Sequence, residues 1–130
     1  MSDWIEADFE RISLERHADL LWVTLRDPRR ANALSVKMIE ELTALYRRPL
    51  LEEGIRAILL RAEGRNFSAG ADLDHLRSLA TAGAEQNRVD SERLRGVFEA
   101  VLRQPALTVA AVQGACVAGG CGLATAHDFV

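Results

Sequence analysis

Two short segments of this 130-residue chain share one design, and they constrain the fold more than any other feature. "NFSAGADL" begins at Asn66 and "GACVAGGCGL" begins at Gly114; each follows an apolar, strand-like run and leads into a helix-like run. Their small residues allow a ligand to approach the backbone closely, and a strand-to-helix turn aims unpaired N–H groups outward. Two such turns facing one another would offer two donors to a carbonyl oxygen that becomes an oxyanion.

A structural alternative exists for these glycines. They close tight turns and let each helix pack against a strand, and a single glycine-rich segment is weak evidence for anything more. Two segments with the same placement favour the two-donor pocket.

The rest of the chain predicts alternating strands and helices. Residues 9–27 form a β-hairpin with its turn at His17–Asp19, because apolar and polar residues alternate on both sides. A helix is expected in 34–51, with Ser35 as its N-cap and Pro49 as its stop. Further strands are expected within 55–64 and 107–114, further helices at 72–80, 92–105 and 118–126, and the start of a strand at 127–130.

This order is typical of an α/β fold with a largely parallel sheet. The continuous apolar run Ala57–Leu60 predicts a strand covered on both faces. The helix within 92–105 should bury one face, made of Leu94, Val97, Phe98, Val101 and Leu102.

Composition excludes several classes of protein. Apolar residues are 48% and charged residues 27% of the chain, which is an ordinary globular balance. The net charge is −3, and the sequence has no stripe of basic residues. Nucleic acid is therefore not an expected partner. The acidic N-terminus does not resemble a signal peptide, and no apolar run has the length of a membrane span. Cys116 and Cys121 suit reduced thiols in a cytoplasmic protein, and neither has neighbours at metal-ligand spacing.

Three blocks of sequence resemble one known family. "RDPRRANALSVKMIEEL", "AILLRAEGRNFSAGADL" and "PALTVAAVQGACVAGGCGLATAHD" are similar to successive blocks of the crotonase superfamily, the enoyl-CoA hydratase/isomerase family. The resemblance runs from about residue 9 to residue 130. Because family members are much longer, it implies that residues 1–130 are the N-terminal part of a single crotonase-like domain, a spiral of ββα units that is incomplete at its C-terminus. The chain also stops where an element is starting, which suggests a fragment.

The resemblance also implies a chemistry. The family acts on acyl-CoA thioesters through an enolate whose oxygen is held by two backbone N–H groups, with coenzyme A as part of the substrate and no separate cofactor. The matching positions are Ala71, after the glycine of the first turn, and Gly119, in the second. Family members assemble as trimers or hexamers and serve fatty acid metabolism.

Other residues match positions that line the family's coenzyme A path. They are Arg29, Ala31, Ser68, Ala69, Asp72, Leu73 and Asp74. Arg29 or Arg30 would meet a phosphate of coenzyme A, or the two arginines are simply a solvated pair. Asn32 is expected to brace its turn. Asp72 favours capping the next helix, and Asp74 and His75 favour exposed positions on it.

One family residue is replaced here. Hydratases of the family place a glutamate just after the second turn, where this chain has Gly122, and a second glutamate at a position past Val130. Two-carboxylate hydration is therefore hard to support, because acid–base catalysis needs groups within hydrogen-bond reach. The turn without this glutamate also resembles family isomerases that move a double bond with one later carboxylate, although other branches lack the glutamate too, so Gly122 does not identify one branch. Nothing in the sequence fixes the direction of Glu85 or Glu92.

Three other interpretations were weighed. A serine hydrolase would use Ser68, His75 and Asp72 or Asp74, but the nucleophile-elbow motif is only partly present. A dinucleotide-binding fold lacks its glycine spacing. A chain that binds acyl-CoA without turnover, or a purely structural fragment, remains the main alternative to an enzyme.

Overall fold

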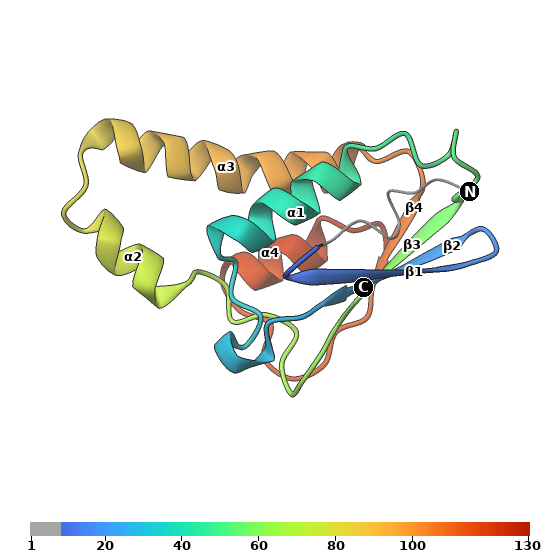
Figure 1. The fold of residues 1–130 in the computed structure, drawn as a ribbon, viewed down its shortest axis with the longest axis horizontal. Coiled ribbons are helices and arrows are strands. Elements are labelled where there is room, and N and C mark those ends of the chain that lie inside the picture. The colour runs from blue at the N-terminus through green and yellow to red at the C-terminus, as the bar shows by residue number, and fades with distance from the viewer. Residues whose placement is uncertain (1–8) are drawn as a thin grey trace.

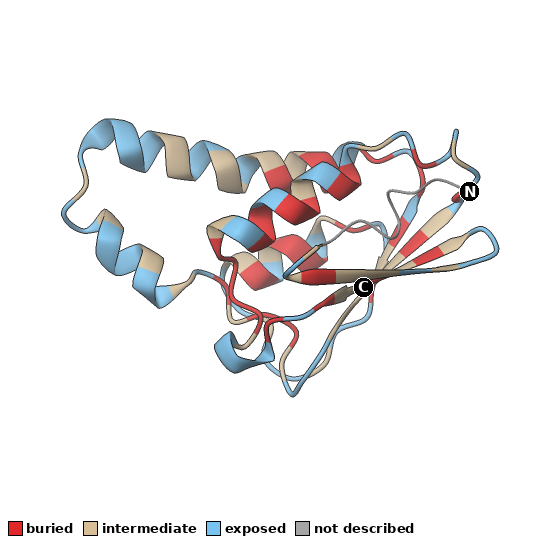
Figure 2. Ribbon diagram, in the orientation of Figure 1, coloured by how far each residue is buried: buried red, intermediate tan, exposed pale blue. Residues whose placement is uncertain are grey.

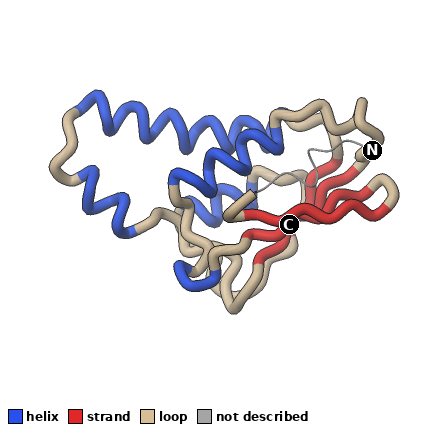
Figure 3. The backbone as a smooth tube through the Cα atoms, in the orientation of Figure 1, coloured by secondary structure: helices blue, strands red, loops and turns tan. Residues whose placement is uncertain are grey.

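The computed structural model describes residues 9–130 and shows a four-stranded sheet with helices packed on it (Figure 1). The strands are β1 (Ile12–His17), β2 (Leu20–Leu25), β3 (Ala57–Ala62) and β4 (Leu107–Ala110). The helices are α1 (Val36–Tyr46), α2 (Leu73–Leu79), α3 (Ala84–Arg103) and α4 (Gly119–Thr125), with a short 3-10 turn at Pro28–Arg30. Long loops join the ends of β2, β3 and β4 to the following elements and lie together (Figure 3).

The sheet is mixed, as the sequence predicts. Its order is β1-β2-β3-β4, with β1 and β2 antiparallel and the other neighbours parallel. Ala18 turns the hairpin with a φ of 56°. Phe129 forms a parallel bridge with Val109, so the expected strand at the end of the chain begins beside β4.

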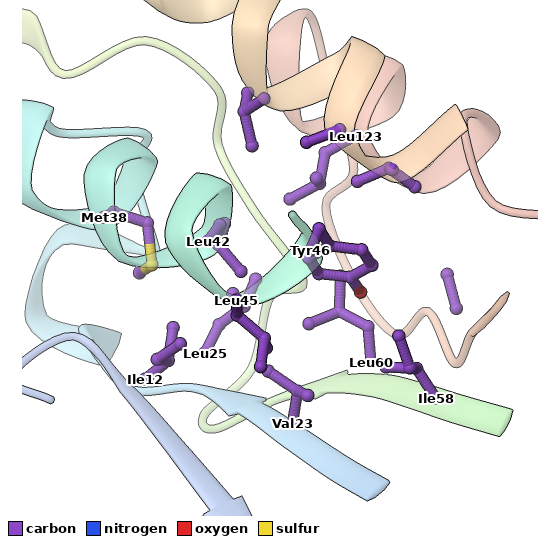
Figure 4. Close-up of a cluster of buried hydrophobic side chains, with 14 of the residues drawn as sticks. Ile12, Val23, Leu25, Met38, Leu42, Leu45, Tyr46, Ile58, Leu60 and Leu123 are labelled. Carbon is purple, nitrogen blue, oxygen red and sulfur yellow. The ribbon is translucent and has the colours of Figure 1, made fainter. Parts of the chain in front are cut away.

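The core lies on one face of this sheet. Side chains of α1, including Leu42, Leu45 and Tyr46, meet Val23 of β2 and the buried residues of β3 (Figure 4). Helices α1, α3 and α4 all lie on this side (Figure 1). The prediction that β3 is covered on both faces is wrong for the described residues, because burial alternates along the strand. On the opposite face, the guanidinium of Arg61 lies 4.4 Å from the centre of the Trp22 ring.

Helix α1 has the expected boundaries. The Ser35 hydroxyl accepts a hydrogen bond from the Met38 N–H at 3.2 Å, which satisfies one of the free donors of the first turn. The helix ends at Tyr46, ahead of Pro49. None of the helices in residues 9–130 is long and apolar enough to cross a membrane.

Helix α3 ends at Arg103, ahead of Pro105 as predicted, but its start and the burial of one residue differ from the prediction. It begins at Ala84, well before the expected Glu92, and its N-terminal half extends away from the sheet with little burial (Figure 2). Arg88 pairs there with Glu85 at 2.6 Å and with Glu92 at 2.5 Å. Such pairs stabilise a helix without an apolar stripe, so hydrophobic periodicity missed this half. Leu102 was expected to be buried but is 67% exposed, because it lies beyond the edge of the buried face.

His127 has a structural role that the sequence did not indicate. Its Nδ1 lies 2.8 Å from the Leu123 carbonyl oxygen, which can only accept, so Nδ1 carries the proton and Nε2 accepts from the Tyr46 hydroxyl at 2.7 Å. This chain of bonds joins the ends of α1 and α4. Burial lowers the pKa of His127 and raises the pKa of Tyr46.

The buried His127 should make stability depend on pH. Above the unfolded-state pKa of about 6.5, the ring is neutral in both states. Below it, the unfolded chain binds a proton that the folded chain resists, so unfolding becomes easier as pH falls. Urea titrations at pH 7.5 and pH 5.5 should show a larger loss of unfolding free energy for the wild type than for His127→Gln. His17→Gln, at an exposed histidine, is the matched control and should keep the wild-type loss. Equal losses in wild type and His127→Gln would contradict the assignment.

Candidate functional site

The two glycine-rich turns touch each other through their backbones. Gly70 has a φ of 85°, in the region that favours glycine. A Cβ at Gly70 would lie 2.9 Å from the Val117 carbonyl oxygen and 3.2 Å from the Gly119 nitrogen. Only a residue without a side chain therefore lets the first turn lie against the second.

Two backbone N–H groups at this contact are unpaired. Among residues 9–130, neither the Ala71 nor the Gly119 N–H donates to a protein acceptor, whereas the N–H groups of Gly70, before Ala71, and of Gly120, after Gly119, both do. The Gly70 N–H donates to the Ser68 hydroxyl at 3.2 Å, and the Gly120 N–H donates to the Val117 carbonyl at 2.9 Å. Ala71 is exposed, Gly119 is half-buried, and both line one small cavity. Two free donors at one cavity can hold a single anionic oxygen.

Asn32 fixes the position of the first turn. Its side-chain oxygen accepts from the Asp27 N–H at 2.8 Å, and its amide group donates to the Glu63 and Asn66 carbonyls at 2.9 and 3.0 Å. The residue is fully buried and has a φ of 52°, which asparagine tolerates. It braces the turn, as expected from the sequence.

Ser68 lies beneath the two turns. It is fully buried, and its hydroxyl donates to the Asn32 carbonyl at 2.8 Å. A Cβ at Gly120 would lie 2.5 Å from the Ser68 carbonyl oxygen, so the second turn rests on this residue. The serine-hydrolase interpretation finds no support, because Ser68 bonds to the backbone and His75 bonds to Asp90.

The two cysteines beside the second turn are free thiols. Burial, followed by the nearby Cys121, raises the pKa of the Cys116 thiol. A raised pKa is the opposite of what a thiolate nucleophile needs.

Two cavities meet at Ala71 and Asp72. The larger, of about 380 Å³, is lined by Arg30, Ala31, Ala33, Ala69, Ala71, Asp72, Leu73 and Asp74. The smaller, of about 80 Å³, is lined by Leu34, Ile39, Ala71, Asp72, His75, Leu76, Asp90, Leu94 and Gly119. The unpaired N–H groups thus lie between a wide, mostly small-residue cavity and a narrow, mostly apolar one.

Five of the seven residues expected on the coenzyme A path line the larger cavity. They are Ala31, Ala69, Asp72, Leu73 and Asp74. Ser68 is buried below it, and Arg29 is exposed but is not part of the lining. Asp72 occupies the N-cap position of α2, yet its side chain makes no capping bond and instead lies 3.5 Å from Nη1 of Arg30.

The sequence of this chain also matches a known protein family. The sequence profile described as Enoyl-CoA hydratase/isomerase matches residues 15–130. The chain belongs to this family.

Individual family members show the same relationship. A Thermus thermophilus protein with the name "Putative enoyl-CoA hydratase" is 44% identical over 108 residues, which cover 83% of this chain and 43% of the relative. A Bacillus subtilis protein named "Probable enoyl-CoA hydratase" is 38% identical over 104 residues, covering 80% and 39%. The solved structure of an enoyl-CoA hydratase from Shewanella pealeana superposes with a TM-score of 0.90 at 29% identity, covering 97% and 48%. The chain spans less than half the length of these relatives, and its crotonase fold is correspondingly partial.

Gly122, where the sequence resemblance leads one to expect a glutamate in hydratases, packs against a ring. A Cβ at Gly122 would lie 3.0 Å from Cζ of Phe98 on α3. A carboxylate there would require Phe98 to move. The packing around Gly122 therefore suits a residue without a side chain.

Sequence patterns missed the residues that form the narrow cavity. Sequence patterns give Leu34 and Ile39 no role in a site, and they predict Leu94 only as part of a buried helix face. His75 was expected to be exposed on α2, but its side chain is 24% exposed and pairs with Asp90. Their spacing in sequence gives no sign that three helices converge on one turn.

Replacing the amide of Asn32 should destabilise the site and the fold together. Asn32→Asp keeps the shape and the acceptor for the Asp27 N–H, but a carboxylate cannot donate to the Glu63 and Asn66 carbonyls. The unmet carbonyls and the buried charge should cost about 2–4 kcal/mol of unfolding free energy. Urea denaturation measures this loss. Asn87→Asp, at an exposed position on α3, should change stability by less than about 0.5 kcal/mol; equal effects at both positions would refute the role of Asn32.

Proposed function

We propose that this chain is the N-terminal part of a single acyl-CoA-binding domain that acts on acyl-CoA thioesters through an enolate. The Ala71 and Gly119 N–H groups would hold the enolate oxygen. The observation that carries the proposal is that both groups are unpaired and line the same cavity. Membership of the Enoyl-CoA hydratase/isomerase family supports it.

The physical basis of the proposal is preorganisation. The turns are held by backbone contact and by the hydrogen bonds of Asn32 and Ser68, so the donors are in place before negative charge develops. Loss of one such donor typically costs 2.7–4 kcal/mol in the transition state, or about 100- to 1,000-fold in rate.

The larger cavity is the proposed path of coenzyme A. Its small residues, Ala31, Ala33 and Ala69, leave room for a pantetheine chain beside Ala71. Arg30 is engaged with Asp72, whereas Arg29 is exposed and makes no ion pair with a described residue. Arg29 is therefore the better placed of the two to meet a phosphate through a charge-assisted bond.

Double-bond isomerisation fits the site better than two-carboxylate hydration. Phe98 occupies the space beside Gly122, so no carboxylate can act from that position without repacking. Isomerisation needs the enolate and one proton carrier. The whole protein is proposed to be a cytoplasmic homotrimer or hexamer, by analogy with its family.

Acyl-CoA binding without turnover is the second candidate function. It is favoured by the coverage of less than half of each relative, since an active site can draw on residues from a whole domain. In this case coenzyme A thioesters would saturate the chain and remain unchanged.

A backbone substitution tests the donors directly. Gly119→Pro removes one N–H and should lower turnover of a 2-enoyl-CoA about 100- to 1,000-fold, followed by NMR in heavy water. Gly119→Ala keeps the N–H, and its Cβ meets only the flexible Cδ1 of Leu34 at 3.1 Å, so it is the matched control and should lose far less.

The outcomes separate the two candidate functions. Equal turnover by Gly119→Pro and wild type would refute the oxyanion role. Saturable binding by the wild type with no turnover would favour the binding function. Circular dichroism must first establish that each variant is folded.

A further inference from the structure

The narrow cavity beside the N–H pair has mostly apolar walls and a few polar groups. Leu34, Ile39, Leu76 and Leu94 supply aliphatic walls, while Asp72, His75 and Asp90 are polar. The side chain of Asp72 already pairs with Arg30 at 3.5 Å. The side chains of His75 and Asp90 are only 24% and 23% exposed. An imidazole in such a cavity is unusual because burying a polar ring has a cost unless it is bonded or used.

The histidine is bonded through one nitrogen only. Its Nε2 contacts the Asp90 carboxylate, which can only accept, so in the neutral ring Nε2 carries the proton. The lone pair is then on Nδ1, which makes no hydrogen bond with any described residue. Arg93 lies 3.6 Å from the same carboxylate oxygen, so the carboxylate is bonded on a second side. This is the arrangement of a base whose tautomer is fixed by a carboxylate.

We propose that His75 is the proton carrier of this site and that Asp90 is its positioning residue. The inference rests on the proposed function of the Ala71 and Gly119 N–H groups. His75 lies four residues after Ala71, and both residues line the same cavity as Gly119. A ligand whose carbonyl oxygen reaches the N–H pair would therefore place its neighbouring carbons beside the imidazole.

The proton step balances without any other reactant. Nδ1 takes a proton from the carbon next to the thioester carbonyl, and that C–H bond breaks. Its electron pair forms the C=C bond of the enolate, and the carbonyl oxygen takes the negative charge and bonds to the two N–H groups. The imidazolium pairs with Asp90, then returns the proton to the same carbon or, in an enoyl thioester, to the carbon two bonds further along.

The simpler alternative is a clamp. Helix α2 has no buried residues, and His75–Asp90 is the hydrogen bond that joins it to α3 in the described chain. A clamp would hold the cavity wall without moving protons. The two roles differ in one respect, since an added base cannot restore a lost clamp.

The test follows exchange of the protons next to the carbonyl of butyryl-CoA in heavy water by NMR, with binding of the same thioester measured by calorimetry. His75→Ala should lower exchange at least 100-fold and leave binding within about threefold, and free imidazole should restore part of the exchange. Asp90→Asn should lower exchange with little change in binding. His17→Gln is the matched control, because His17 also pairs with a carboxylate, Glu15, at 3.0 Å but lies on the hairpin.

Each outcome has one meaning. Full exchange by His75→Ala would overturn the inference and leave the oxyanion proposal intact. Lost exchange without rescue by imidazole, together with weakened binding, would establish the clamp and overturn the proton role. Binding by the wild type with no exchange would also overturn it. Absence of butyryl-CoA binding by the wild type would instead overturn the proposed function, and this inference with it.

Discussion

The contact between Gly70 and the Val117–Gly119 backbone is the constraint on which the rest of the site depends. A single methyl group at Gly70 would meet a carbonyl oxygen at 2.9 Å, so the two turns could not approach. Without that approach, the Ala71 and Gly119 N–H groups would not share a cavity. The parallel neighbours β3 and β4 make the contact possible, because parallel strands bring the turns at their carboxyl ends to one edge of the sheet.

The fold was predictable wherever local chemistry decides the structure. Ser35 as the N-cap of α1, the hairpin turn at Ala18 and the strand that begins near Phe129 were all visible in the sequence. The first half of α3 was not, because ion pairs and not an apolar stripe stabilise it. The burial of β3 was also misjudged, since an apolar run does not tell which face the helices of this chain will cover.

The candidate site, like the fold, could be predicted from the sequence only in part. The glycine-rich turns predicted that backbone donors would face outward, and the resemblance to the family pointed to Ala71 and Gly119 in particular. The narrow cavity could not be predicted, because its walls come from α1, α2 and α3, and no local pattern encodes their convergence. Ser68 was expected beside a ligand from its place next to the first turn; the structure shows in addition that it supports the second turn, which no local pattern indicated.

The glycine-rich turns on one side of the N–H pair and helix α2 on the other differ in rigidity. We therefore expect them to have different roles. The turns are held by buried hydrogen bonds from Asn32 and Ser68, so the position of a bound carbonyl is fixed by the core. Helix α2 contributes no buried residue, and segments with few buried contacts open at low free energy. In the proposed function, Leu76 on that helix would adjust to the acyl chain while the carbonyl stays in place, and the bond to Asp90 would hold His75. Such a site would keep one chemistry constant and let the acyl side vary with substitutions at Leu76.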